Sequence, residues 1–326
     1  MLLKLVIPIS HKKNTPMVKT INYSVVIPIY NEEEVIPELW RRLDKALKQL
    51  EGCSEVIFVN DGSFDSSLEI LTKLSYENNQ VKVISLSRNF GHQCSISAGI
   101  DHAKGQAVIL MDGDLQDSPE SIIRFIDKWK QGYDVVYAIR HKRKEKLFKR
   151  LAFNLFYRIL SLLSGLEIPL DAGIFSLMDR KVILAIRSMP ERNKYISGLR
   201  AFAGFKQIGV VVERGTRYRG KPRMTLIKLF KLAFDAIFSF SIIPLRIATF
   251  LGLSFSLSSF ILGVVGLFVK FILNRKFLDW DYGLTTTFFM GGIQIFFLGI
   301  IGEYIGRIYD EVKQRPYYII EQKIGF

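Results

Sequence analysis

Residues 107–117 read AVILMDGDLQD, an apolar run followed by two aspartates, Asp112 and Asp114, that lie two positions apart. A short apolar run bounded by turn residues predicts a buried strand. In an extended segment, residues two apart point to the same side, so these two carboxylates can share a hard cation such as Mg²⁺ or Mn²⁺. Gln116 can add a neutral oxygen ligand. A solvated acidic loop is the alternative, but the position directly after a strand favours a metal site.

Apolar runs alternate with helical patterns on the N-terminal side of this stretch. Strands are predicted at 23–30, 55–60, 81–87 and 107–112, and helices at 33–50, 66–76 and 94–102. Such alternation indicates βαβ units and a parallel sheet covered on both faces. Ligands of these sheets bind at the carboxyl ends of the strands, which is where the polar clusters of this sequence fall. The clusters are at 31–32, 60–63 and 112–114.

The polar cluster after the second predicted strand reads VNDGSFD, residues 59–65. Asp61 can accept hydrogen bonds from a base edge or a ribose hydroxyl. Gly62 allows a tight turn, and Asp65 can cap the following helix. A plain strand-to-helix turn has the same composition, so this cluster alone does not decide between the two.

Composition separates the chain into two kinds of segment. Hydrophobic residues make up 49% and charged residues 23% of the 326 residues, so the two classes must be segregated along the sequence. The net charge of +14 favours a polyanionic partner: nucleic acid, a phosphate substrate or an anionic membrane. Cys53 and Cys94 form no disulfide framework, which fits a reducing cytosol. His92 and His102 lack metal-ligand spacing, and no Walker-type loop or Ser/His/Asp pattern is present.

Two apolar stretches near the C-terminus predict a membrane hairpin. Residues 247–271 and 284–303 are each long enough to span a bilayer. The short loop between them holds Trp280 and Tyr282, which suit a membrane interface. Lys and Arg flank the hairpin but are sparse in this loop, so the large domain and both termini are expected in the cytoplasm. Two buried helices of a soluble core are the alternative, but no other part of the chain could cover so much apolar surface.

The predicted organisation has four parts. They are an N-terminal extension (1–22), a cytosolic domain (23–229), a membrane segment (230–308) and a cytosolic C-terminal tail (309–326). Residues 1–16 do not resemble a cleaved signal peptide and are expected to be dispensable. Residues 141–166 are basic and then apolar at helical spacing, which favours interfacial amphipathic helices over a domain helix with a solvated basic end.

A basic cluster, RGTRYRGKPR, precedes the membrane segment at 214–223. Arginine side chains grip phosphate oxygens with two parallel hydrogen bonds. We expect Arg217 or Arg223 to contact a substrate phosphate. A contact with lipid headgroups is the alternative, and both roles can coexist.

Taken together, these features resemble the polyisoprenyl-phosphate glycosyltransferases of inverting family 2. That group includes dolichol-phosphate mannose synthases and the bacterial undecaprenyl-phosphate glucosyltransferases, which are the more similar of the two. The resemblance runs in order from residue 23 to the tail and includes the hairpin. It rests on VVIPIYNEEE (25–34), VNDGSFD (59–65), LSRNFGHQ (86–93), AGIDHAKG (98–105), MDGDLQDSPE (111–120), MPERNKYISGL (189–199), FSFSIIPLR (238–246) and GEYIGRIYDEVKQRPYY (302–318).

The resemblance implies a GT-A fold, with a mostly parallel sheet, in a protein of the bacterial inner membrane. It also implies transfer of a hexose, expected to be glucose from UDP-glucose, to a polyprenyl phosphate for cell-envelope glycosylation, with Mg²⁺ or Mn²⁺ as cofactor. A homo-oligomer is a further expectation. The implied nucleotide-sugar residues are Pro28, Tyr30, Glu32, Asp61, Asp112 and Gly113. The implied metal ligands are Asp112, Asp114 and Gln116. The implied lipid-phosphate and diphosphate contacts are Arg140, Arg214, Arg217 and Arg223. The implied catalytic residues are Asp112, Asp114, Asp171 and Arg140.

The sequence departs from the family pattern at two motifs. Many bacterial members read TGDFRL where this chain reads AGIFSL, so Ile174 and Ser176 replace an acid and an arginine. The basic motif G-x-S-K becomes GKPR at 220–223. A phosphate monoester has a second pKa of about 6. At neutral pH the acceptor oxygen is therefore already anionic and needs no general base. Asp171 is therefore expected to orient the acceptor, and a turn or cap role is its alternative.

Three other functions explain fewer of these sequence features. A processive polysaccharide synthase would carry a Q-x-x-R-W motif, which is absent, and two spans are few for a translocation channel. A non-catalytic membrane scaffold would explain the two motif departures. A nucleic-acid-binding protein would explain the charge but not the spans.

Overall fold

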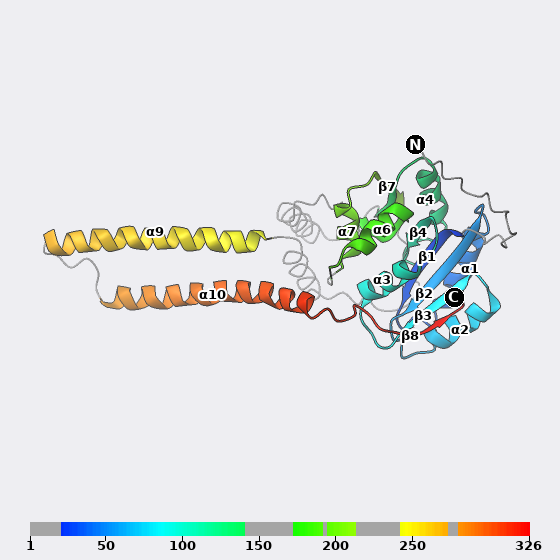
Figure 1. Ribbon diagram of the computed structural model, residues 1–326, viewed down its shortest axis with the longest axis horizontal. Helices are drawn as coiled ribbons and strands as arrows, with labels where there is room; N and C mark the ends of the chain where they lie inside the picture. The colour runs from blue at the N-terminus through cyan, green and yellow to red at the C-terminus, as the bar shows by residue number, and fades with distance from the viewer. Residues whose placement is uncertain (1–20, 141–171, 192–193, 213–241, 273–279) are drawn as a thin grey trace, which may run out of the picture.

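One mixed sheet forms the centre of the fold, in the strand order β7-β5-β6-β4-β1-β2-β3-β8 (Figure 1). The structure is a computed structural model and describes residues 21–140, 172–191, 194–212, 242–272 and 280–326. The strands are β1 (Ile21–Ile29), β2 (Cys53–Asn60), β3 (Val81–Leu86), β4 (Ala107–Leu110), β5 (Val135–Arg140), β6 (Ala172–Asp179), β7 (Gln207–Val212) and β8 (Ile320–Ile324). The helices are α1 (Ile36–Leu47), α2 (Ser67–Glu77), α3 (His92–His102), α4 (Ser121–Lys130), α6 (Arg180–Ser188), α7 (Ile196–Phe202), α9 (Ile243–Ile272) and α10 (Trp280–Val312).

Most neighbouring strands run in the same direction. β1 pairs in parallel with β2 and β4, β2 with β3, and β5 with β7. β6 is antiparallel to both β4 and β5, and β8 is antiparallel to β3. The carboxyl ends of β1, β2, β3, β4, β5 and β7 therefore lie along one edge of the sheet, together with the first residues of β6 and β8. The prediction of a mostly parallel sheet is confirmed.

Helices cover both faces of this sheet, because successive side chains of each strand point to opposite sides. In β1, Val25 and Ile27 are fully buried in a core that also contains residues of α1, α2 and α4. Val26, between them, lies in a second core with residues of α3, α6 and α7. This two-sided burial explains why the strands are nearly continuous apolar runs.

Helix α3 lies close against the sheet because it carries Gly99. A Cβ atom added to Gly99 would come within 2.2 Å of Val26 Cγ1 and 3.2 Å of Val59 Cγ2. Any larger residue would push the helix away from β1 and β2. This close packing fixes the N-terminus of α3 beside the carboxyl edge of the sheet.

The two C-terminal helices, α9 and α10, run side by side away from the sheet domain (Figure 1). Within them, Ile243–Gly266 has a mean hydropathy of 1.9 and Phe289–Val312 of 1.5, so both are long and apolar enough to cross a membrane. Their apolar side chains face outward, and Phe250 and Phe260 are 70% and 69% exposed. The predicted spans, 247–271 and 284–303, fall within these two helices.

The C-terminal residues return to the sheet, which the sequence analysis did not predict. β8 pairs with β3, with Ile324 opposite Val83, and closes that edge of the sheet (Figure 1). The Tyr318 hydroxyl donates to Asp101 Oδ2 at 2.8 Å, and the ring of Phe326 packs edge-on against His102. The predicted polar tail therefore contains an edge strand that joins the end of the hairpin to the sheet domain.

Some predictions lie outside the described residues. These are the N-terminal extension up to residue 20, the interfacial helices at 141–166, Asp171, and the basic cluster at 214–223. Within the described part, β1 begins at Ile21, two residues before the predicted start of the domain.

Candidate active site

A cleft of about 320 Å³ lies at the carboxyl edge of the sheet. It is lined by Pro28, Ile29, Tyr30, Glu32, Asp61, Asn89, Gly91, His92, Asp112, Gly113 and Asp114. These residues come from the ends of β1, β2, β3 and β4 and from the start of α3. The structure thus brings together all the residues predicted to contact the nucleotide sugar and both predicted acidic metal ligands.

The Asp112–Asp114 turn is packed tightly against the end of β1. A Cβ atom on Gly113 would lie 2.6 Å from Ile29 Cδ1 and 3.0 Å from the Pro28 carbonyl oxygen. Leu115 is buried with a φ of 57°, a left-handed conformation that non-glycine residues rarely adopt. Such backbone strain persists only where the surroundings enforce it, and it is common at functional sites.

Two predicted metal ligands, Asp114 and Gln116, are linked within this turn. The backbone N–H of Gln116 donates to Asp114 Oδ1 at 3.1 Å, and the Gln116 side chain is half-buried. Asp112 and Asp114 are also half-buried and line the same cleft. Among the described residues, no cluster of three or more His, Cys, Asp or Glu side chains could hold a metal by itself. Two carboxylates suit Mg²⁺ or Mn²⁺, because these ions retain water and take further oxygen ligands from substrate phosphates.

Asp61 holds the loop that leads into α3. Its side chain is almost fully buried, and it accepts hydrogen bonds from the backbone N–H groups of Phe90 at 2.8 Å and Gly91 at 3.0 Å. Burial raises the pKa of Asp61 above its ordinary value, although these two hydrogen bonds act in the opposite direction. The sequence predicted only a ligand contact for Asp61. The structure adds a second role, since this carboxylate fixes the backbone that forms one wall of the cleft.

His92 is a cleft residue that the sequence analysis missed. It is the first residue of α3, and its Nε2 lies 2.9 Å from Asp112 Oδ1. Desolvation lowers the pKa of His92, but the hydrogen bond to Asp112 and the charge of that carboxylate outweigh it and raise the pKa above its ordinary value. The available signal was a glycine and a histidine between a strand and a helix. The sequence analysis set His92 aside because it lacks metal-ligand spacing, but His92 contributes to the site through its contact with Asp112.

The loops after β1 and β2 are joined by reciprocal hydrogen bonds. The N–H of Asn31 donates to Ser63 Oγ at 3.0 Å, and the N–H of Phe64 donates to Asn31 Oδ1 at 2.8 Å. Further along, the N–H of Glu33 donates to Asp65 Oδ2 at 3.2 Å. Asp65 also accepts from the N–H of Ser67 at 3.1 Å, as expected of a residue that caps α2. The two loops therefore form one rigid wall of the cleft.

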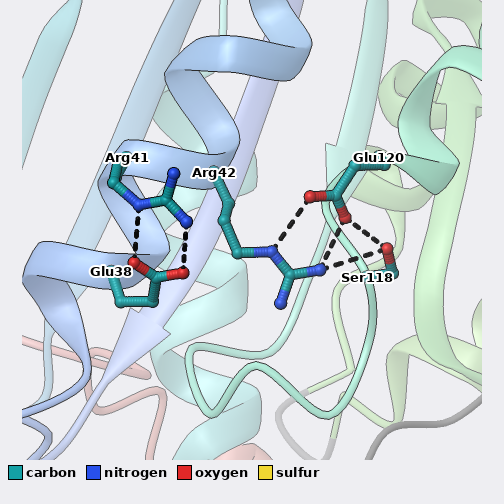
Figure 2. Close-up of polar contacts among 5 residues, drawn as sticks. All are labelled: Glu38, Arg41, Arg42, Ser118 and Glu120. Atoms are coloured by element: carbon teal, nitrogen blue, oxygen red, sulfur yellow. Dashed lines mark hydrogen bonds and ion pairs between the residues drawn. The ribbon is translucent and has the colours of Figure 1, made fainter.

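An ion pair fixes the segment that follows the acidic turn (Figure 2). Arg42 of α1 donates from Nε to Glu120 Oε1 at 2.9 Å and from Nη2 to Glu120 Oε2 at 2.6 Å. The Ser118 hydroxyl also donates to Glu120. The guanidinium lowers the pKa of Glu120 from 4.5 to about 2. Since Glu120 directly precedes α4, this pair joins α1 to the segment that follows Asp112 and Asp114.

Of the remaining predicted residues, only the backbone of Arg140 is described, and it lies at the same edge of the sheet. Arg140 is the last residue of β5 and pairs with Val212, the last residue of β7. The basic cluster at 214–223 begins two residues after β7, and Asp171 directly precedes β6. The side chains of these predicted residues lie outside the described part. Ile174 is half-buried and packs with the second core, and the buried Ser176 hydroxyl donates to the Ile174 carbonyl oxygen at 2.8 Å.

A mostly parallel α/β sheet with an acidic turn at its carboxyl edge is the arrangement expected of a GT-A-like glycosyltransferase, and comparison with known proteins identifies the family. Residues 24–187 match the profile of glycosyl transferase family 2. The chain belongs to glycosyl transferase family 2. The predicted GT-A fold and the predicted glycosyltransferase activity are therefore confirmed.

Several relatives are similar to this chain over nearly its whole length. It is 44% identical to the uncharacterized glycosyltransferase YkcC of Bacillus subtilis, over 95% of this chain and 96% of that protein. It is 38% identical to the SfII prophage-derived bactoprenol glucosyl transferase of Shigella flexneri, over 92% of this chain and 97% of that protein. Among solved structures, glucosyl-3-phosphoglycerate synthase from Mycobacterium tuberculosis matches with a TM-score of 0.48 and 18% identity, over 67% of this chain and 77% of that chain.

Proposed function

We propose that this protein transfers glucose from UDP-glucose to a polyprenyl phosphate, giving a lipid-linked sugar for cell-envelope glycosylation. The observation that carries the proposal is the cleft in which Tyr30, Asp61, Asp112 and Asp114 meet, in a chain that also carries two apolar helices long enough to span a membrane. The similarity to proteins named bactoprenol glucosyl transferase supports both the sugar and the lipid acceptor.

The donor occupies the cleft with its base toward the loops after β1 and β2. Tyr30 and Asp61 lie at that end, and the tight turn at Gly113 brings the backbone close to the diphosphate. Asp112 and Asp114 would hold the divalent cation, and Gln116 from the same turn would supply a further oxygen ligand. When bound, the cation neutralises the charge that develops on the leaving diphosphate.

The reaction is a single inverting displacement. An anionic oxygen of the lipid phosphate forms a bond to the anomeric carbon of glucose, and the bond from that carbon to the UDP oxygen breaks. No proton has to be removed, because the acceptor phosphate is already ionised near neutral pH. The task of the protein is to align the two reactants and to stabilise the departing charge.

In the proposal, the acceptor side is formed by predicted residues that adjoin β5, β6 and β7 in the sequence. Arg140 ends β5, Asp171 precedes β6, and Arg214, Arg217 and Arg223 follow β7. In the proposal these arginines bind the lipid phosphate or the diphosphate, and Asp171 orients the acceptor. Guanidinium groups are suited to this role because they form paired hydrogen bonds with phosphate oxygens.

The membrane hairpin keeps the cleft near the headgroups where the acceptor phosphate lies. In the proposal α9 and α10 cross the membrane, and the domain at 23–229 and both termini face the cytoplasm. The excess of Lys and Arg on that side supports this orientation.

A lipid-extraction assay tests the proposal. The full-length protein in nanodiscs that contain undecaprenyl phosphate and Mg²⁺ or Mn²⁺ is incubated separately with radiolabelled UDP-glucose, UDP-galactose and GDP-mannose. We expect a one-sugar, organic-extractable product from UDP-glucose, with inverted anomeric configuration. Release of water-soluble oligomers would indicate a processive synthase. Failure to bind any of the three donors would indicate a non-catalytic scaffold.

A further inference from the structure

Phe64 is an exposed aromatic residue that the proposed reaction does not yet use. Its side chain is 86% exposed, although it lies in the loop after β2 that forms part of the active-site wall. An exposed phenyl ring retains apolar surface in water that folding would ordinarily bury. Its position beside the cleft therefore suggests a ligand that covers it.

The backbone that carries Phe64 is fixed on both sides. The N–H of Phe64 donates to Asn31 Oδ1 at 2.8 Å, and the N–H of Ser63 donates to Asn60 Oδ1 at 3.3 Å. On the other side, the N–H of Ser66 donates to Glu33 Oε2 at 2.8 Å. The exposure of the ring is thus not the result of a loose loop, because the surrounding hydrogen bonds hold the turn in place.

The ring of Phe64 extends an aromatic wall that begins inside the cleft. Its centroid lies 6.3 Å from that of Tyr30, with an interplanar angle of 72°, which is an edge-to-face contact. Tyr30 lines the cleft directly. A planar group bound beside Tyr30 therefore has a second aromatic side chain next to it.

We propose that Phe64 stacks on the base of the nucleotide donor and raises the affinity of the donor site for a planar base. This inference rests on the proposed function, because it assigns the outer end of the same donor site. Bases stack on aromatic side chains whatever their hydrogen-bonding edge, so Phe64 contributes affinity for a flat base. Selection among bases is left to polar groups deeper in the cleft, such as Asp61.

Binding of two nucleotides to two variants tests this role. The full-length protein in detergent with Mn²⁺ is titrated calorimetrically with UDP and with 5,6-dihydro-UDP, whose saturated ring keeps its hydrogen-bonding edge but is neither flat nor aromatic. We expect Phe64→Ala to raise the Kd of UDP about tenfold and to leave the Kd of dihydro-UDP nearly unchanged. Phe64→Trp should retain wild-type affinity for UDP.

Tyr76→Ala is the matched control. Tyr76 is also a highly exposed aromatic residue, at 79%, and it lines the same shallow surface groove as Phe64, but it lies on α2 away from Tyr30. This variant should bind both nucleotides like the wild type. If wild type and Phe64→Ala bound UDP with equal affinity, the role of Phe64 would be overturned, but the proposed function would stand. An equal loss for both nucleotides would also overturn it, because it would indicate a displaced loop. A wild-type protein that binds no UDP would overturn the proposed function as well.

Discussion

The imidazole of His92 contacts the carboxylate of Asp112, with Nε2 2.9 Å from Oδ1. The contact joins the first residue of α3 to the first carboxylate of the acidic turn after β4. Because Gly99 allows α3 to lie directly on β1 and β2, the position of Asp112 depends on how this helix packs. The cleft is therefore assembled by the packing of one helix as well as by the strand ends.

Replacing His92 with alanine should impair the acidic turn without unfolding the protein. His92 is 46% exposed on its side chain, so its loss creates no core cavity, but Asp112 loses a partner that orients it. Loss of a group that orients a metal ligand costs about 10- to 100-fold in metal affinity or activity. Titration of UDP binding with Mn²⁺ measures the loss. His102→Ala, at the other end of α3, is the control and should keep its apparent Mn²⁺ affinity; equal losses in both variants would count against a specific role for His92.

The Arg42–Glu120 pair should make stability depend on pH in the acid range. The pKa of Glu120 is depressed from 4.5 to about 2 in the folded protein, so its stabilising contribution is complete above about 4.5 and is lost as the pH falls toward 2. Glu120 is half-exposed, so we expect Glu120→Gln to lower the free energy of unfolding at pH 7 by only about 0.5–1 kcal/mol. The difference in Tm between wild type and Glu120→Gln should narrow as the pH is lowered from 5 to 3. A difference that stays constant over this range would contradict the assignment.

Gly113→Ala should damage both stability and catalysis. The added methyl group would lie 2.6 Å from Ile29 Cδ1 and 3.0 Å from the Pro28 carbonyl oxygen, so the acidic turn has to move. Overpacking of this kind costs about 1–3 kcal/mol. Thermal unfolding and glucosyl transfer measure the two effects. Gly252→Ala, where an added methyl group meets nothing within 4 Å, is the control and should change neither. Full activity in Gly113→Ala would show that the turn tolerates displacement.

Removing the C-terminal strand should destabilise the sheet domain. Deletion of residues 317–326 exposes the unpaired edge of β3, and an exposed strand edge also promotes aggregation. We expect a lower Tm and faster amide hydrogen exchange in β3 than in the full-length protein. Tyr318→Phe removes only the hydroxyl that donates to Asp101 and should have a smaller effect. Unchanged exchange in β3 after the deletion would mean that β8 contributes little to the sheet.

The parts of the fold that the sequence predicted are those with a local signal. The apolar runs that became β1 to β4 were recognisable because strands buried on both faces are apolar throughout. The strand β8 was missed because its short sequence, IEQKI, becomes a strand only by pairing with β3, which lies more than 200 residues earlier. Register between such distant segments is not encoded in either one alone.

The same limit explains what was missed at the site. Helix α3 was predicted to begin at Cys94, but it begins at His92, after a Gly91 that caps it with a φ of 100° and without a side-chain hydrogen bond. The usual Ser, Thr, Asp or Asn capping signal is absent there, so His92 fell outside the predicted helix. The Arg42–Glu120 pair joins residues 78 positions apart and likewise left no local pattern.

Transfer by the Asp112→Asn and Asp114→Asn variants is the most direct test of the central claim that the acidic turn supports glucosyl transfer to a lipid phosphate. Each full-length protein, in nanodiscs with undecaprenyl phosphate and Mn²⁺, is given radiolabelled UDP-glucose, and label in the organic phase is followed with time. We predict a linear rise for the wild type and a rate at least about 100-fold lower for each variant. Wild-type rates in either variant would contradict the account.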